Sequence, residues 1–182
     1  MLRFKIEPTL YILFAVLLFL VPLPWLVAWM IAVSFHEFCH FAVVKVLGGN
    51  VCAFSVNFGG VSMECAGLTE RDYLFSVLAG PLGGLILGLV GRWFPRLAIC
   101  SWLLSVYNLI PVFPLDGGRV LQILVKKNAV FLAVEKIILG LSLLAAMICF
   151  FTDFGTLPLI IAISLWIKNR KRPCKETIWG VQ

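Results

Sequence analysis

The sequence has little charge for its length. Of its 182 residues only 13% are Asp, Glu, Lys or Arg, and just two are histidine, whereas 62% are hydrophobic. Soluble domains are roughly 45–50% apolar by a similar count. This scarcity of charge excludes an ordinary soluble globular domain and indicates an integral membrane protein. The length suits one compact bundle, so we predict a single domain over residues 1–182.

Cysteine motifs and a leader cleavage site are also missing. The first apolar stretch, residues 10–21, is followed by Pro-Leu-Pro-Trp instead of a small-x-small cleavage site, which favours a retained helix. The cysteines form no C-x-x-C pair, so we expect small apolar packing residues. They are Cys39, Cys52, Cys65, Cys100, Cys149 and Cys174.

The excess of basic residues does not point to nucleic acid. The net charge is +6, and most Lys and Arg residues flank apolar segments. This placement is typical of membrane proteins, in which basic residues set the orientation. We therefore expect a lipid bilayer, and no nucleic acid, as a partner.

A membrane span needs about 20 apolar residues, and six apolar stretches are candidates, of which the first and the last are short for a full span. The six candidates are Thr9–Val21, Trp25–Leu47, Tyr73–Gly91, Leu97–Pro114, Phe131–Phe151 and Gly155–Ile167. We predict an all-α polytopic membrane protein with about six transmembrane helices. Its core covers residues 9–167, and a basic tail covers residues 168–182.

The distribution of Lys and Arg predicts the orientation. Six spans place both termini on one side, and the side richer in basic residues is cytoplasmic. Only Arg92 and Arg96 would lie on the opposite side. The side of the termini would hold Arg3, Lys5, Lys45, Arg71, Arg119, Lys126, Lys127, Lys168, Arg170, Lys171, Arg172 and Lys175. We predict that both termini are cytoplasmic.

The segment between the second and third spans has a different pattern. Apolar residues alternate with polar or small ones on both sides of Gly59-Gly60. That pattern predicts a β-hairpin over about Val51–Cys65 with a Gly-Gly turn. The alternative is an irregular interfacial loop.

Both histidines of the chain lie in one short motif, His36-Glu37-Phe38-Cys39-His40, which matches H-E-x-x-H. Residues four apart share one face of a helix, so the two imidazoles can bind one ion. The alternative is a pair of interior histidines with no metal. Charged residues at the centre of a membrane helix cost about 2.5–3.5 kcal/mol each and are usually functional, which favours the metal site.

A catalytic zinc typically has three protein ligands, so a third is needed. Asp116 is the favoured candidate, because prolines and glycines break the helix around it. Broken backbone inside a membrane lies where protein buries it or water reaches it. Alternatively, Asp116 caps a helix or pairs with Arg119. Glu135 is the competing ligand, and Cys39 could also approach the metal.

The two motifs together are specific. H-E-x-x-H at 36–40 and N-x-x-P-x-x-P-L-D-G-G at 108–118 resemble those of the site-2 protease family of intramembrane zinc metalloproteases. The chain is most similar to the branch of the stage IV sporulation protease FB. The resemblance implies one Zn²⁺ per chain held by His36, His40 and Asp116, with Glu37 as the catalytic glutamate. It also implies that Asn108 holds the substrate backbone.

The resemblance further implies a bacterial cell membrane, a transmembrane or membrane-tethered protein substrate and regulatory membrane proteins as partners. A sigma-factor precursor in sporulation is one such substrate. The third span keeps Ala79-Gly80-Pro81 but lacks the asparagine that relatives often carry in A-G-P-x-x-N. We expect no C-terminal nucleotide-sensing CBS domain, because too few residues follow Ile167.

Two other classes of function remain open at this point. Intramembrane His, Glu and Asp side chains also serve metal-ion or proton transporters, although transporters often contain paired repeats and none is visible here. A non-catalytic relative that binds membrane proteins is the third possibility. The intact Glu37 argues against it, because a scaffold needs no general base.

Overall fold

The structure is a computed structural model that describes residues 3–6, 18–19, 21–57, 60–125, 128–151, 162–163 and 165–167. Within these residues the chain is mostly helical. It forms two compact units, the first ending at Asn108 and the second running from Leu109 to Glu176.

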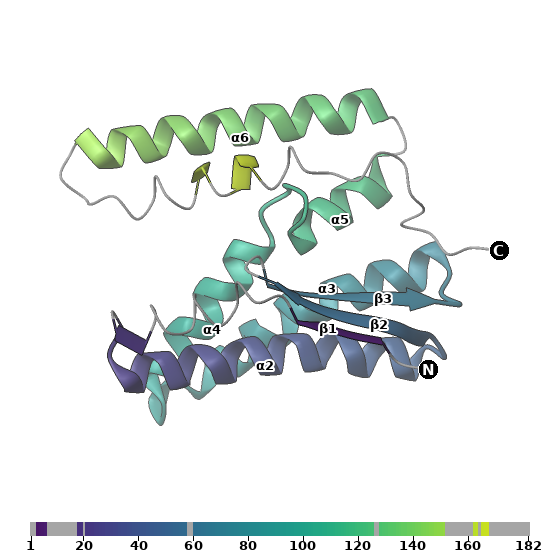
Figure 1. The fold of residues 1–182 in the computed structure, drawn as a ribbon, viewed down its shortest axis with the longest axis horizontal. Coiled ribbons are helices and arrows are strands. Elements are labelled where there is room, and N and C mark those ends of the chain that lie inside the picture. The colour runs from purple at the N-terminus through teal and green to yellow at the C-terminus, as the bar shows by residue number, and fades with distance from the viewer. Residues whose placement is uncertain are drawn as a thin grey trace. The chain divides into compact units, whose positions relative to one another are not determined.

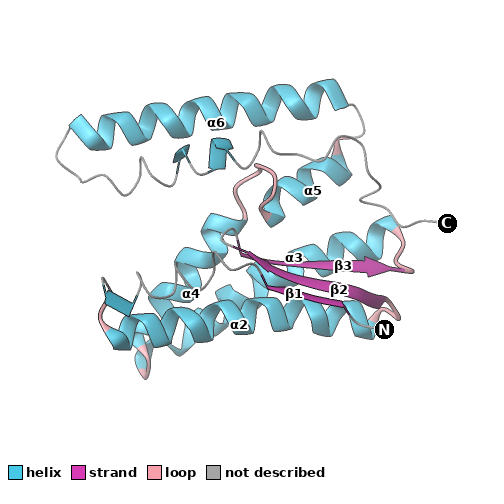
Figure 2. Ribbon diagram, viewed as in Figure 1, coloured by secondary structure: helices cyan, strands magenta, loops and turns pink. Residues whose placement is uncertain are grey.

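The described part of the first unit includes three α-helices and a small sheet (Figures 1 and 2). The helices are α2 (Leu23–Val46), α3 (Glu70–Leu87) and α4 (Pro95–Asn108), with a 3₁₀ helix η1 (Gly88–Arg92) between α3 and α4. The strands are β1 (Arg3–Ile6), β2 (Asn50–Asn57) and β3 (Gly60–Ala66). The second unit contains α5 (Asp116–Leu124) and α6 (Asn128–Phe151), which contact each other.

The hairpin predicted from the alternating pattern is confirmed. Strands β2 and β3 pair antiparallel, with Asn57 opposite Gly60 at the turn. The prediction of an all-α fold with only a hairpin was incomplete, since β1 pairs parallel to the other edge of β2. A four-residue strand has too short a pattern to recognise, and its partner lies about fifty residues along the chain.

Two helices among the described residues are long and apolar enough to cross a membrane, Leu23–Val46 and Glu70–Arg92. They agree with the second and third predicted spans, and α6 agrees with the fifth. The predicted spans Thr9–Val21 and Gly155–Ile167 lie largely outside the described residues.

The fourth predicted span, Leu97–Pro114, was too long. Helix α4 ends at Asn108, and its 14 residues are fewer than a full span needs. Non-helical backbone follows and leads into α5, which begins at Asp116 and was not predicted. Pro111 ends the helix because proline lacks an N–H and disfavours helical backbone in the residue before it.

Helix α2 presents one buried stripe to the rest of the first unit. Its buried residues recur every fourth position at Ala28, Ala32, His36, His40 and Val44. Residues four apart share a face, so the histidines belong to the packed face rather than to the lipid-facing one. Ala28 and Ala32 pack with Cys100 and Leu104 of α4 in the apolar core.

The C-terminus of α2 is closed by a glycine cap. The N–H of Gly49 donates to the carbonyl of Val44 (2.9 Å), and the N–H of Gly48 donates to that of Lys45 (3.2 Å). Gly48 has φ of +78°, the left-handed conformation that this cap requires. The cap turns the chain directly into β2.

Helix α3 carries a stripe of small residues that lets its neighbours approach closely. Ser76, Gly80, Gly84 and Gly88 recur every fourth position and are buried. The Ser101 hydroxyl of α4 donates to the Gly84 carbonyl (2.7 Å). Small residues at helix contacts are typical of membrane proteins, where close packing and hydrogen bonds hold helices together.

The small stripe predicts that Gly84→Ala loosens α3 from α4. An added Cβ would lie 2.2 Å from the hydroxyl oxygen of the buried Ser105. Overpacking of this kind costs about 1–3 kcal/mol, so the free energy of unfolding in detergent should fall by that amount.

Gly140→Ala is the matched control for this substitution. Gly140 lies in α6, and nothing lies within 4 Å of its added Cβ. Both substitutions gain helix propensity, so the difference between them isolates the packing effect. Equal unfolding free energies for the two variants would show that Gly84 is not a tight contact.

Candidate metal centre

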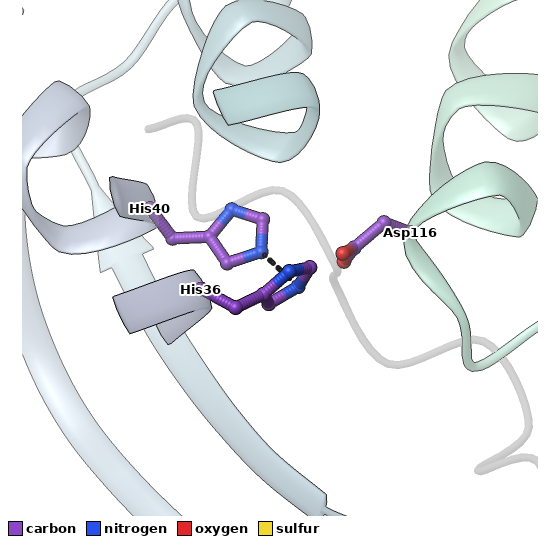
Figure 3. Close-up of side chains that lie close together, drawn as sticks. All are labelled: His36, His40 and Asp116. Atoms are coloured by element: carbon purple, nitrogen blue, oxygen red, sulfur yellow. Dashed lines mark hydrogen bonds between the residues drawn. The ribbon is translucent and has the colours of Figure 1, made fainter. Parts of the chain in front are cut away.

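His36 and His40 lie together on the buried stripe of α2, as the H-E-x-x-H spacing predicts. They are only 3% and 8% exposed. Their Nε2 atoms lie 3.2 Å apart and share a hydrogen bond (Figure 3). Two nitrogen ligands at 2.0–2.1 Å from a tetrahedral zinc would be about 3.3 Å apart. The pair therefore has the separation that two ligands of one zinc ion require.

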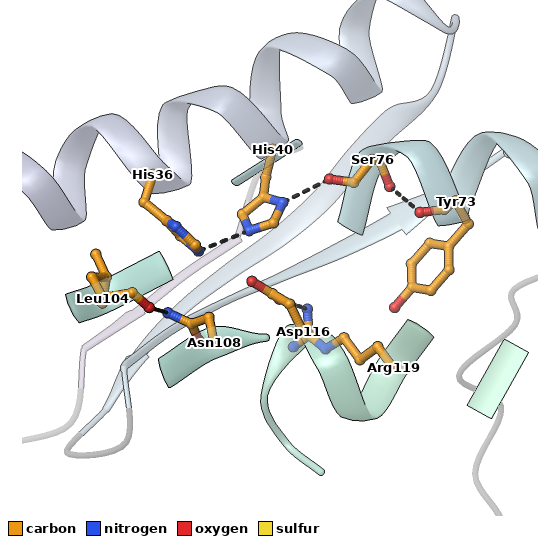
Figure 4. Close-up of polar contacts among 8 residues, drawn as sticks. All are labelled: His36, His40, Tyr73, Ser76, Leu104, Asn108, Asp116 and Arg119. Carbon is orange, nitrogen blue, oxygen red and sulfur yellow. Dashed lines mark hydrogen bonds and ion pairs between the residues drawn. The ribbon is translucent and has the colours of Figure 1, made fainter. Parts of the chain in front are cut away.

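The backbone of α3 orients the ring of His40. Its Nδ1 lies 2.7 Å from the backbone carbonyl oxygen of Ser76 (Figure 4). A carbonyl only accepts hydrogen bonds, so Nδ1 carries the proton. In the neutral ring Nε2 then has a lone pair directed at His36. A partner of this kind fixes the tautomer and orientation of a metal-binding histidine.

Gly80 leaves the space in which the two ring nitrogens converge. A Cβ at this position would lie 2.2 Å from Nε2 of His40 and 2.8 Å from Nε2 of His36. Any side chain here would collide with both candidate ligand atoms. A zinc ion thus fits the residues present, by donor type, by nitrogen separation and by the space at Gly80.

The other two residues of interest in α2 differ in their surroundings. Glu37 is half-buried and lies one position from His36, off the histidine stripe. Cys39 packs toward α3, because a Cβ on Gly83 would lie 2.3 Å from its Sγ. That contact agrees with the predicted packing role of Cys39.

Asp116 lies in the second unit, at the first position of α5. It is 6% exposed and pairs with Arg119, whose Nη1 lies 3.8 Å from Oδ1 (Figure 4). The ion pair that the sequence offered as an alternative is therefore present. The distance is long for a direct hydrogen bond, and an ion pair does not prevent a carboxylate from binding a metal.

Asn108 is the last residue of α4, and its side chain makes a hydrogen bond within the same helix. Its side-chain Nδ2 donates to the carbonyl of Leu104 at 3.0 Å (Figure 4). An amide has a second hydrogen and two acceptor lone pairs, so this bond leaves capacity for a substrate backbone. Its predicted role stays a prediction.

Glu135, the competing ligand, has a different partner within the second unit. Its Oε1 accepts a hydrogen bond from the backbone N–H of Phe113 at 2.7 Å. Glu135 is 2% exposed, although it lies on an apolar helix. From the sequence, Glu135 was recognisable only as an acid within a predicted span, and its hydrogen bond with Phe113 was not predicted.

The fold resembles that of a known membrane protease. The structure is similar to that of the site-2 protease from Methanocaldococcus jannaschii, with a TM-score of 0.67 and 20% sequence identity. The match covers 96% of this chain and 93% of that one. At this identity the likeness establishes the fold.

Two sequence comparisons give further similarities. The model of peptidase family M50 matches residues 88–149, which include Asn108 and Asp116 but not the histidine motif. A zinc metalloprotease of Methanocaldococcus jannaschii is 29% identical over 155 residues, or 75% of this chain. The chain spans 45% of that protein's length. These findings agree with the resemblance: the chain is similar to site-2 type zinc metalloproteases in fold and in sequence, and the relatives support zinc as the metal.

The space at Gly80 predicts that Gly80→Ala weakens zinc binding. The added Cβ must displace one or both imidazoles, and displaced ligands bind metal less tightly. We expect at least a tenfold loss, the lower end of what disturbing a metal ligand's support causes. Chelator competition on the detergent-purified protein measures this affinity.

Gly84→Ala serves as the control, because it lies one turn along the same stripe and meets serines instead of histidines. It should lower stability without changing zinc affinity. Equal zinc affinity in Gly80→Ala and wild type would contradict the assignment of this space to the metal.

Proposed function

We propose that this chain is an intramembrane zinc metalloendopeptidase that hydrolyses peptide bonds of transmembrane or membrane-tethered proteins. The observation that carries the proposal is the pair of buried, convergent imidazoles beside Gly80, with a glutamate between them in sequence. Neither ion transport nor scaffolding needs a glutamate at this position of the motif.

We assign the zinc ligands to His36, His40 and Asp116. Support comes from the donor set, because all three are buried and each offers one ligand atom. Among the described residues the buried acids are Asp116 and Glu135, and the carboxyl of Glu135 already accepts from Phe113. Two imidazoles and one carboxylate are a ligand set that catalytic zinc uses.

In the proposed reaction, Glu37 and Asn108 have separate roles. Zinc, when bound, supplies Lewis acidity that activates water and polarises a peptide carbonyl. Glu37 takes the proton of the attacking water and returns it to the nitrogen of the leaving amine. Asn108 holds the backbone of the substrate through its amide.

The substrate must be extended at the point of cleavage, because a helix hides its carbonyls in its own hydrogen bonds. Strand β3 is an edge of the described sheet, since β2 pairs with it on one side and β1 pairs with the far side of β2. An exposed edge can bind an extended segment by main-chain hydrogen bonds. We propose that the substrate strand adds to β3.

We also propose a cytoplasmic location for both termini, supported by the distribution of Lys and Arg. A sigma-factor precursor of a bacterial sporulation pathway fits the proposed substrate class. The two relatives named above come from an archaeon, and their names do not include sporulation. We therefore propose the substrate only as a class, namely transmembrane or membrane-tethered proteins.

Metal content and cleavage of a membrane-tethered reporter test the proposal together. Wild type should hold about one zinc per chain. Glu37→Gln should keep that zinc but lose cleavage by about 10²- to 10⁴-fold, because only the proton acceptor is removed. Cleavage retained in Glu37→Gln would reject the general base. Metal flux into vesicles without cleavage would favour a transporter.

Asp116→Ala should weaken zinc binding in the same measurement, because it removes a ligand. Arg119→Gln is the matched control, since it removes the ion pair and keeps the carboxylate. If both variants lost zinc equally, Asp116 would act through the ion pair. If Asp116→Ala kept its zinc, another residue would have to be the third ligand.

Single proline substitutions at Ser62 and Met63 test strand addition at β3. Backbone N–H groups of adjacent residues point to opposite sides of a strand, so one of the two faces β2 and the other faces outward. Proline at the inward position should lower stability, and proline at the outward position should lower reporter turnover more than stability. Equal effects on turnover and stability at both positions would mean that the hairpin is only a folding element.

A further inference from the structure

The backbone between α4 and α5 carries an unusual hydrogen-bonding problem. Residues 109–115 are not helical, and they lie in a chain in which two of the described helices are long and apolar enough to cross a membrane. Buried backbone N–H groups that lack a partner cost free energy, and within a membrane no bulk water replaces the partner. Each N–H near Asp116 therefore needs an acceptor.

Two of these N–H groups have acceptors within the segment itself. Pro111 and Pro114 have none. The N–H of Val112 donates to the carbonyl of Ile110 (2.8 Å), and that of Leu115 donates to Val112 (2.9 Å). The N–H of Phe113 is different, since its partner is the side chain of Glu135, 22 residues along the chain on α6.

The same segment is held on its other side by α5. A Cβ on Gly118 would lie 2.4 Å from the backbone N of Phe113, and one on Gly117 would lie 2.2 Å from the carbonyl oxygen of Leu109. Both glycines are buried in the first turn that Asp116 begins. The segment therefore lies directly on the α5 backbone, and a shift of Phe113 would be transmitted to this turn.

We propose that Glu135 is a positioning residue for Asp116. Its buried carboxyl group accepts the Phe113 N–H and so fixes the broken segment against Gly117 and Gly118. In this way it sets the direction of the Asp116 side chain three residues later. The inference rests on the proposed function in so far as Asp116 is a zinc ligand, and it excludes Glu135 itself from the ligand set.

Three variants test this role. Glu135→Gln keeps a side-chain oxygen that can accept from Phe113, whereas Glu135→Leu removes the acceptor at similar size. Lys136→Gln is the matched control, because it changes a charge at the adjacent, exposed position of α6. Zinc affinity is measured by chelator competition on the detergent-purified full chain.

We expect Glu135→Leu to bind zinc about 10- to 100-fold more weakly, as is usual when support for a metal ligand is lost. Glu135→Gln should stay within about threefold of wild type, and Lys136→Gln should be unchanged, since support at Phe113 is retained in both. Equal loss in Glu135→Leu and Glu135→Gln would overturn the inference, because the hydrogen-bond acceptor would not be what matters.

Hydrogen–deuterium exchange of the metal-free protein gives a readout that does not depend on zinc. In Glu135→Leu the peptide containing Phe113 should exchange faster, while peptides of α2 and α4 keep their wild-type rates. Unchanged exchange at Phe113, or faster exchange throughout α2 and α4, would overturn the inference. Wild-type protein that binds no zinc would instead overturn the proposed function, and the exchange result would still decide whether Glu135 fixes the segment.

Discussion

The close approach of α2 and α3 at Gly80 is the constraint on which the histidine pair depends. A single Cβ at this position would occupy the space where the two ring nitrogens converge. The same approach brings the Ser76 carbonyl to Nδ1 of His40, which fixes the ring's tautomer. Because α3 has small residues every fourth position, it can pack this tightly against α2 and then against α4.

A second constraint applies to the backbone that leads to Asp116. An apolar environment requires a partner for every N–H, and the two prolines of the segment reduce the number of donors. Local turns satisfy Val112 and Leu115, and a carboxyl group on α6 satisfies Phe113. The N–H groups of Val112, Phe113 and Leu115 thus each have an acceptor.

Much of the fold was predictable because membrane helices and hairpins have strong local patterns. The apolar length of α2 and the H-E-x-x-H spacing place both histidines on one face, and the structure confirms this arrangement. The alternation around Gly59-Gly60 predicted β2 and β3. The predicted fourth span was wrong at its end, because hydropathy continues through 109–114 although Pro111 stops the helix.

Contacts between distant parts of the chain were not predictable in the same way. Strands β1 and β2 pair although about fifty residues separate them in the sequence. A strand of four residues has too short a pattern to predict which strand it pairs with. Glu135 appeared in the sequence as an acid in an apolar span and as the competing candidate for the third ligand. Its bond to Phe113 became visible only with the fold, since 22 residues separate the two.

The sequence by itself determined that the chain is a membrane protein, that two imidazoles share one helical face and that a broken helix precedes Asp116. These properties depend on composition and on spacing along one helix, both of which are local. The tertiary structure decided that Gly80 makes room for the ring nitrogens, that Ser76 orients His40 and that Glu135 supports Phe113. Such contacts join segments far apart in the chain, and only packing determines which of them meet.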